Sequence, residues 1–330
     1  MHRALRGDQL ERSCVIKEGE IKRMTKRAVV VGVNDYSAQG QPILHYCVSD
    51  AKSIYDLLIN GLGFDQGQVL LYTDAEANRE TIINALRTIT LGGTPGDVAC
   101  FYFSGHGARV SARPEQADCD KYYEAILPAS GAWISDREIY QIADSLQPSF
   151  VNFTLILDSC HSGGIHESDA GEKCRTIPLS KDVTQAMVQY LKTVVPCGIC
   201  IPPDADVLDN NVRNVSTAAD GTIMLDEDLN RALVPLSKST LIAACEFNEL
   251  SWEDSSLGHG LMTQAFLDIV NSSEFHITYL DLLNQLRARV GDYITSKILP
   301  SHPGVTQVPH LRGQLNRMEE GFLEAWIDSR

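Results

Sequence analysis

The stretch Ala28-Val-Val-Val-Gly-Val33 decides the fold class, because it is a continuous apolar run, rich in β-branched residues, with no polar face. A strand of this kind is buried on both sides, as at the centre of a parallel sheet. Further strands are expected at residues 69–72, 97–103, 150–157 and 240–244. Segments with helical periodicity alternate with them, at residues 50–59, 78–90 and from 135 onward. This alternation predicts an α/β fold with a mostly parallel central sheet and helices on both faces.

Two of these helices carry start signals. The helix at 78–90 is entered through Asp74 and Asn78, residue types whose side chains cap helix N-termini. The later helix opens with Ser135 and, three positions on, Glu138, which is the capping-box pattern.

The periodicity is lost between about residues 165 and 237, where irregular stretches such as CGICIPPDAD occur. A loop of that length inside a compact domain is usually functional, disordered or a site of processing. The α/β pattern resumes after it, with helices expected near 261–270 and 279–290 and a last strand near 305–308.

Composition limits the partners. The formal net charge of −15, from 28 basic and 43 acidic residues, argues against nucleic acid or an anionic membrane surface. No apolar run reaches the roughly 18 residues that a membrane span needs. Nine cysteines without framework spacing, and an N-terminus without an apolar signal core, favour reduced thiols and a cytoplasmic location. Residues 1–26 are expected to be a polar, disordered lead, with Met24 as an alternative start.

Two predicted strands end in unusual sequences, Phe103-Ser-Gly-His-Gly107 and Leu157-Asp-Ser-Cys-His-Ser-Gly-Gly164. The carboxyl ends of parallel strands form the ligand crevice, so His106 and Cys160 are expected to meet there. A thiol near its free pKa is only a few per cent thiolate at neutral pH and needs a base. We expect Cys160 to be the nucleophile and His106 its base, which later protonates the leaving amine. The backbone N–H groups of Gly107 and Cys160 suit an oxyanion hole.

Purely structural roles for these residues remain open from the sequence alone. A single cysteine or histidine at a strand end is usually a buried or hydrogen-bonded core residue, so it is the pair that indicates catalysis. His161 and His166 are rival bases, although adjacent side chains diverge, which disfavours His161. Cys197 and Cys200 lack a full set of zinc ligands nearby and are interpreted as incidental.

The motif SGHG followed roughly fifty residues later by DSCHSGG resembles the caspase-like cysteine peptidases, most closely the metacaspases and the bacterial orthocaspases. VVVGVNDY with Leu44-His-Tyr-Cys-Val-Ser-Asp50, and Trp252 with residues 258–266, are similar to other segments of these proteins. The resemblance implies a caspase-like three-layer sandwich, built as one composite catalytic domain. Its large-subunit region would cover 27–165 and its small-subunit region 238–330. Residues 166–237 would be a connector and a candidate processing segment.

Charge and resemblance together predict specificity. Asp50 and Asp158 fall at the same end of the sheet, and two carboxylates in one small pocket favour a cation between them. The resemblance implies that Cys47 and Ser104 line this pocket with them, for an Arg or Lys before the cut. Caspases carry Arg after Ser-Trp to hold a substrate Asp, and Trp252 is followed here by Glu253, which reverses that charge. A helix N-cap is the alternative role for Asp50.

Two further expectations rest on the resemblance. No cofactor is expected to be required, but a calcium site would draw on acidic residues at comparable positions, namely Asp118, Asp120, Asp136 and Asp169. Solvated loop charges explain the same residues. Cleavage after basic residues would make the connector a substrate of its own enzyme, at Arg175, Lys181 or Arg213.

The predicted function is therefore a cysteine endopeptidase acting on proteins or peptides with Arg or Lys at the cut site. The alternatives are a peptidase of the same clan with another specificity, and a caspase-fold pseudoprotease or interaction module. A flavodoxin-like binding module is disfavoured, because residues 34–40 contain no Gly-rich phosphate loop.

Overall fold

The computed structural model describes residues 24–91, 93–94, 96–111, 122–144, 152–159, 239–245, 249–313 and 315–324, together with five short strands outside these ranges. The five are β1 (Ile16–Lys17), β2 (Glu20–Ile21), β10 (Glu172–Cys174), β11 (Val215–Thr217) and β12 (Ile223–Leu225).

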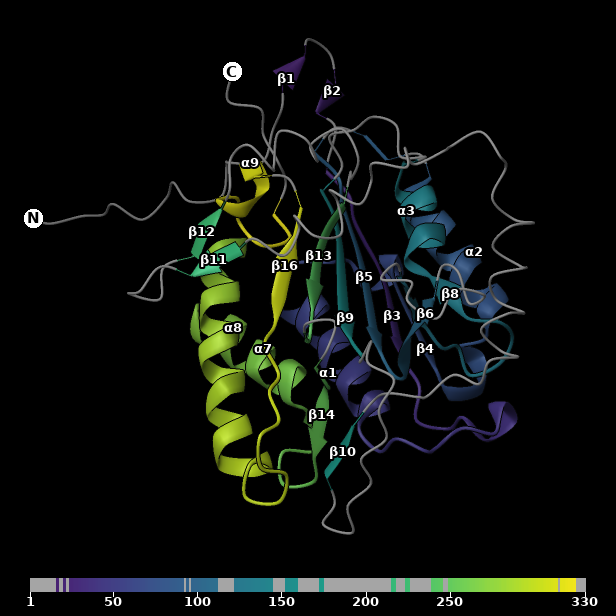
Figure 1. The fold of residues 1–330 in the computed structure, drawn as a ribbon. Coiled ribbons are helices and arrows are strands. Elements are labelled where there is room, and N and C mark those ends of the chain that lie inside the picture. Colours follow the sequence, from purple (N-terminus) through teal and green to yellow (C-terminus); the bar gives the residue numbers. More distant parts are fainter. Residues whose placement is uncertain are drawn as a thin grey trace, which may run out of the picture.

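A six-stranded sheet forms the centre of the molecule, in the order β16-β13-β9-β5-β3-β4 (Figure 1). Its strands are β3 (Lys26–Gly32), β4 (Val69–Thr73), β5 (Val98–Ser104), β9 (Asn152–Asp158), β13 (Ser239–Ala243) and β16 (His310–Arg312). All neighbouring pairs are parallel except β13 with β16. The mostly parallel sheet expected from the apolar runs is thereby confirmed.

Helices cover both faces of this sheet, which confirms the three-layer sandwich (Figure 1). On one face lie α2 (Arg79–Thr90) and α3 (Asp136–Asp144); on the other lie α1 (Cys47–Asn60), α7 (Leu261–Ser272) and α8 (Tyr279–Tyr293). Alternation along the strands explains the two cores. Val29 and Val31 pack in the cluster of α2 and α3, whereas Ala28 and Val30 pack in the cluster of α1, α7 and α8.

Several smaller elements surround the sandwich. A three-stranded antiparallel sheet consists of β6 (Gly107–Ser111), β7 (Tyr122–Ile126) and β8 (Ile134–Ser135), and a second consists of β10, β14 (Trp252–Asp254) and β15 (His259–Gly260). The pairs β1-β2 and β11-β12 complete the sheets. Short helical turns are η1 (Ser37–Gln39), η2 (Gln66–Gln68), η3 (Asp74–Glu76), η5 (Ile294–Ile298) and α9 (Leu315–Met318).

The predicted helix starts are largely confirmed. Asn78 caps α2, since its Oδ1 accepts the Thr81 N–H at 2.9 Å. Ser135 and Glu138 form the expected capping box, with each side chain accepting the other residue's backbone N–H at 3.3 Å. The N-cap role for Asp50 is wrong, because α1 begins three residues earlier with Tyr46 at the N-cap position.

The last predicted strand, at 305–308, is wrong in position. The strand that pairs with β13 is β16, at His310–Arg312. At residues 305–308 a side chain takes the place of a neighbouring strand as hydrogen-bond acceptor, because the Val308 N–H donates to Glu249 Oε2 at 2.7 Å. An apolar run can therefore end in a loop when a carboxylate takes the place of a neighbouring strand.

Helix α1 lies unusually close to the sheet at Gly32, the last residue of β3. A Cβ placed on Gly32 would collide with the backbone carbonyl oxygen of Cys47 and approach the Ala51 Cβ within 2.7 Å. Only glycine permits this contact, and the contact sets the height of the first turn of α1, which carries Asp50, above the strand ends.

We predict that Gly32→Ala lowers the free energy of unfolding by about 1–3 kcal/mol, because the new methyl group meets rigid backbone. The matched control is Gly291→Ala in α8, where a Cβ meets nothing within 4 Å. That change should raise stability by about 0.5–1 kcal/mol, as is usual for Gly to Ala in a helix. Urea denaturation of both variants measures the difference. Equal stabilities would contradict the close approach of α1.

Candidate active site

Three strands of the sheet end level with one another. The parallel register sets Gly32, Ser104 and Asp158 in one row at the carboxyl edge of β3, β5 and β9. His106 follows Ser104 by two residues, and Cys160 follows Asp158 by two, although Cys160 itself lies outside the described residues. The chain therefore leaves two adjacent strands at the same height, with one of the two predicted catalytic residues shortly after each.

His106 is buried and held from two sides. Its Nε2 lies 2.8 Å from the carbonyl oxygen of Pro42, and its ring packs on Tyr36 with centroids 4.6 Å apart. A carbonyl oxygen can only accept, so Nε2 carries the proton and donates it to Pro42. In the neutral ring Nδ1 is then the nitrogen with a lone pair, and it is the nitrogen that can act as a base.

The glycine before His106 has a steric reason. The Tyr36 hydroxyl accepts the His106 backbone N–H at 2.9 Å and donates to the Leu127 carbonyl at 3.2 Å. A Cβ on Gly105 would collide with that hydroxyl oxygen. The second glycine, Gly107, opens β6 and pairs with Ile126. The motif thus fixes the histidine backbone between β5 and a short antiparallel sheet.

Asp158 is fully buried, and its carboxylate accepts hydrogen bonds from two described residues far along the chain. Ser251 Oγ donates to its Oδ1 at 2.7 Å, and Thr263 donates to its Oδ2 through the backbone N–H at 3.1 Å and through Oγ1 at 2.5 Å. Thr263 lies in the first turn of α7, whose N-cap residue Gly260 has no side chain to cap it. Asp158 supplies that missing acceptor, and the positive end of the helix dipole favours its negative charge.

Asp50 is also fully buried at the start of α7. Ser104 Oγ donates to its Oδ2 at 2.8 Å, and Gly260 N–H donates to its Oδ1 at 3.1 Å. A further donor is His259, whose Nδ1 lies 2.9 Å from Oδ1. Both predicted pocket carboxylates are therefore brought together at one helix N-terminus, where the described donors to them are hydroxyl groups, backbone N–H groups and His259.

The other predicted pocket residues have well-defined surroundings. Cys47 is buried at the first position of α1. Trp252 is fully buried and packs on His302, with ring centroids 4.8 Å apart. The buried carboxylate of Glu253 accepts the backbone N–H groups of His45 at 2.9 Å and Tyr46 at 3.3 Å. Glu253 thus anchors the loop before α1, the loop that also carries Pro42. Contact of these residues with a substrate stays a prediction.

Several residues of the site were not predicted from the sequence. They are Tyr36 and Pro42, which hold His106, and Ser251, His259, Gly260 and Thr263, which hold the two carboxylates. A signal was present in one case: Gly260 begins a helix without a capping side chain, so an acceptor from elsewhere in the chain was to be expected.

Of the remaining predicted site residues, all but Asp136 lie outside the part of the chain that the structure describes. They are Asp118, Asp120 and Asp169 of the calcium set, and Arg175, Lys181 and Arg213 of the connector. Asp136 is half-buried at the first position of α3. Within the described ranges, no three His, Cys, Asp or Glu residues gather as metal ligands would. Calcium binding therefore stays a prediction.

One described cysteine is excluded as a nucleophile. Cys100 lies inside β5, and burial raises the pKa of its thiol to about 12, so it stays protonated at neutral pH. Cys47, Cys100 and Cys245 are all buried and none forms a disulfide.

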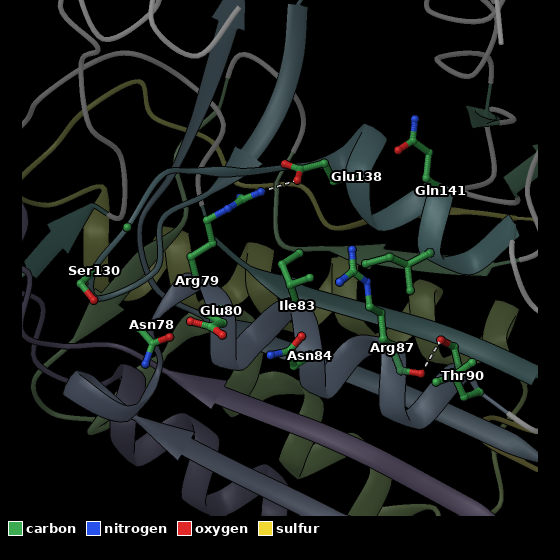
Figure 2. Close-up of a pocket in the computed structure, with 13 residues that line it drawn as sticks. Asn78, Arg79, Glu80, Ile83, Asn84, Arg87, Thr90, Ser130, Glu138 and Gln141 are labelled. Carbon is green, nitrogen blue, oxygen red and sulfur yellow. Dashed lines mark hydrogen bonds and ion pairs between the residues drawn. The ribbon is translucent and has the colours of Figure 1, made fainter. Parts of the chain in front are cut away.

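A separate hollow of about 870 Å³ lies between α2 and α3, in the helical layer that these two helices form (Figure 2). Arg79, which lines the hollow, forms an ion pair with Glu138 and donates a hydrogen bond to the Trp133 carbonyl. None of the residues assigned to catalysis or to the cut-site pocket lines it. The hollow is therefore not part of the candidate active site.

Among the described helices, none is both long enough and apolar enough to cross a bilayer.

Comparison with known proteins defines the class. The family model described as the caspase domain, of peptidase family C14, matches residues 25–318. The chain belongs to this family.

Individual relatives agree with that class. Metacaspase-1 of Schizosaccharomyces pombe is 26% identical over 283 residues, covering 79% of this chain and 63% of that protein. Metacaspase-4 of Arabidopsis thaliana is 33% identical over 147 residues, covering 43% of this chain and 34% of that protein. The chain thus spans less than two thirds of either relative. The crystal structure of protein GSU0716 from Geobacter sulfurreducens has a TM-score of 0.59 and 18% identity, covering 91% of this chain and 99% of that one, and shows the shared fold.

We predict that Asp158→Asn lowers the free energy of unfolding by about 1–3 kcal/mol, because an amide group cannot accept from Ser251 and from both Thr263 donors. Asp292→Asn, at an exposed position of α8, is the control and should stay within about 0.5 kcal/mol of the parent. Chemical denaturation of the two variants is the measurement. If Asp158→Asn and the parent protein have the same free energy of unfolding, the hydrogen bonds of the carboxylate do not stabilise the position of α7.

Proposed function

We propose that this protein is a cysteine endopeptidase that cuts after Arg or Lys, with Cys160 as nucleophile and His106 as base. The observation that carries the proposal is the setting of His106. His106 is buried two residues after β5, the strand that pairs with β9, and its Nε2 proton is committed to Pro42, so Nδ1 is the basic nitrogen. Membership of a peptidase family supports the reaction class.

The mechanism follows from these roles. His106 Nδ1 takes the proton of the Cys160 thiol, and the thiolate attacks the scissile carbonyl carbon. The oxyanion is stabilised by the N–H groups of Gly107 and Cys160, at a typical worth of about 3 kcal/mol each. The protonated His106 then gives its proton to the leaving amine as the C–N bond breaks. Water, deprotonated by His106, releases the acyl group and restores the thiol.

Charge supports the specificity. Asp50 and Asp158 are both buried, and the described donors to them include hydroxyl groups, backbone N–H groups and His259. Hydrogen bonds of this kind stabilise the negative charge of a buried carboxylate. A guanidinium or ammonium group supplies the opposite charge that such a site favours, and an aspartate side chain is repelled. We assign the pocket for the residue before the cut to these two residues with Ser104 and Cys47.

A cleavage assay on peptides that differ only in the residue before the cut tests this proposal. Arg and Lys peptides should be cleaved, and Asp and norleucine peptides refused. Cys160→Ala and His106→Ala should lower kcat/KM by at least about 10²–10⁴-fold. His276→Ala is the control, because that side chain is 83% exposed and lies on the loop before α8. Cleavage by Cys160→Ala at the parent rate would overturn the nucleophile. A preference for acidic or apolar residues would overturn the pocket.

The same preference makes the connector a substrate, and a strand pairing favours one of the three candidates. β10 pairs antiparallel with β14, with Lys173 opposite Glu253 and Cys174 opposite Trp252. β10 therefore runs toward Ser251, whose hydroxyl binds Asp158. An extended peptide that adds to a strand edge is a common mode of substrate binding. Arg175 is the next residue in the chain after β10, whereas Lys181 and Arg213 adjoin no described strand that pairs with β14.

We propose that the enzyme cuts itself between Arg175 and Thr176. Because β10 and β14 belong to one chain, the half-time of cleavage should not depend on protein concentration. Arg175→Ala should slow it at least tenfold, while Lys181→Ala and Arg213→Ala keep the parent rate and Cys160→Ala stays whole. Mass spectrometry of the fragments identifies the new N-terminus. A terminus elsewhere, with unchanged cleavage of Arg175→Ala, would rule this bond out.

Two expectations remain predictions of the sequence and its resemblance. One is activation by calcium through the four acidic positions of the calcium set, a step that the dyad chemistry does not require. The other is a cytoplasmic location with reduced thiols. Cys47, Cys100 and Cys245, which are buried and form no disulfide, are compatible with it.

A further inference from the structure

His259 lies between a buried carboxylate and solvent. It belongs to the short strand β15, directly before the N-cap residue of α7, and its side chain is 16% exposed. Its Nδ1 lies 2.9 Å from Oδ1 of Asp50, whose side chain is fully buried. The other named donors to Asp50 are buried as well, namely Ser104 Oγ and the Gly260 N–H. Among the described donors to Asp50, His259 is thus the one that solvent reaches.

The contact determines the state of the ring. An ionised carboxylate only accepts hydrogen bonds, so Nδ1 is the donor to Asp50. In the neutral ring Nε2 then carries a lone pair and is an acceptor. Asp50 and His259 together therefore offer an acceptor on a side chain that solvent reaches in part, backed by a buried carboxylate.

We propose that His259 is a specificity-determining residue for the cut site, with the neutral ring accepting a hydrogen bond from the cation of the substrate. This inference rests on the proposed function, since it concerns the same pocket. A cationic donor gains from the hydrogen bond to Nε2 and from the negative charge of Asp50 behind the ring. An uncharged side chain of the same shape gains less. Arg and Lys, rather than long side chains in general, are then selected.

The charged groups around the pair are consistent with this role. β15 pairs with β14, with Asp254 opposite His259 and Glu253 opposite Gly260. The Asp254 carboxylate caps its own turn, since its Oδ1 accepts the backbone N–H groups of Ser256 and Leu257. The Glu253 carboxylate accepts the backbone N–H groups of His45 and Tyr46. Asp50 is thus the carboxylate that the described contacts give to His259.

The alternative is that His259 only positions Asp50 and the turn before α7, and two substitutions separate the roles. In His259→Asn the Nδ2 atom stands at the place of Nδ1 and can still donate to Asp50, while Nε2 is lost. In His259→Ala both are lost. The control is His276→Asn, which alters a second histidine that donates through Nδ1 to a carboxylate, Glu324 at 3.3 Å, but at an 83% exposed surface position.

The experiment measures KM and kcat for peptides with Arg, Lys or citrulline before the cut, together with the melting temperature. Citrulline has the shape of arginine without its charge. His259→Asn should keep the melting temperature and kcat and raise KM for Arg and Lys peptides about tenfold, the typical effect of losing one hydrogen bond to a charged group. It should also reduce the preference for Arg over citrulline. His259→Ala should show the same KM effect with a lower melting temperature.

Each other outcome decides against the proposal. If His259→Asn matches the parent in KM and in its preference for Arg over citrulline, the histidine has only a structural role. The same holds if both variants lose stability and kcat while that preference is kept. If His259→Asn does not fold, His259→Gln takes its place with the criteria reversed. Its amide oxygen reaches the position of Nε2 while the donor at the position of Nδ1 is lost, so KM and the preference for Arg over citrulline should stay near those of the parent. A KM raised about tenfold, with a reduced preference for Arg over citrulline, would then decide against the proposal. A parent protein that cleaves neither Arg nor Lys peptides removes the proposed function itself, and this inference with it.

Discussion

Burying a carboxylate costs several kcal/mol unless hydrogen bonds replace the water it loses, and this chain buries two at the same edge of one sheet. Asp50 comes from α1 and Asp158 from β9, yet both accept from the start of α7. The N-cap residue of α7 is a glycine, so no capping side chain of its own accepts from the first N–H groups of this helix. The helix receives acceptors for its free N–H groups, and the carboxylates receive donors. This exchange determines where α7, β14 and β15 lie relative to the strand ends.

The setting of His106 depends on a second chain of contacts that ends in the same region. Pro42 orients the ring, and the loop that carries Pro42 is held by Glu253 through the His45 and Tyr46 N–H groups. Glu253 stands one residue after Trp252, whose N–H donates to Gln307 at 3.0 Å. The choice of basic nitrogen in the histidine therefore depends on strand β14, far away in the sequence. Preorganisation of this kind is typical of sites whose geometry must be accurate before the substrate binds.

Local patterns predicted much of the architecture because the relevant physics is local. Apolar runs located five strands of the central sheet, and a Ser–Glu spacing located a helix start, since burial periodicity and capping act over a few residues. The rule that parallel strands expose their carboxyl ends at one edge assigned His106 and Cys160 to the same end of the sheet from the sequence alone.

Other features could not be found in this way. The partner of His106 is a backbone carbonyl, which every residue type possesses, so the sequence carries no mark of Pro42. Ser251, His259 and Thr263 are ordinary residue types whose roles arise from contacts across about two hundred positions to Asp50 and across about a hundred to Asp158. The charge of Glu253 suggested a role in binding a basic substrate, but in the structure its carboxylate accepts hydrogen bonds from backbone N–H groups. Residues 305–308 have strand-like composition, yet Glu249 rather than a strand satisfies Val308.

The order of the central sheet bears on what a broken chain would do. β13 and β16 come from the last third of the sequence, yet β13 lies directly against β9, and α7 and α8 share one core with α1. A cut in the connector would leave every one of these interfaces in place, because none of them depends on the connector's peptide bonds. The two polypeptides would then unfold as a single cooperative unit and would share one stability. Covalent continuity would matter for bringing the halves together during folding, through the loop-closure entropy of a single chain, and much less for keeping them together afterwards.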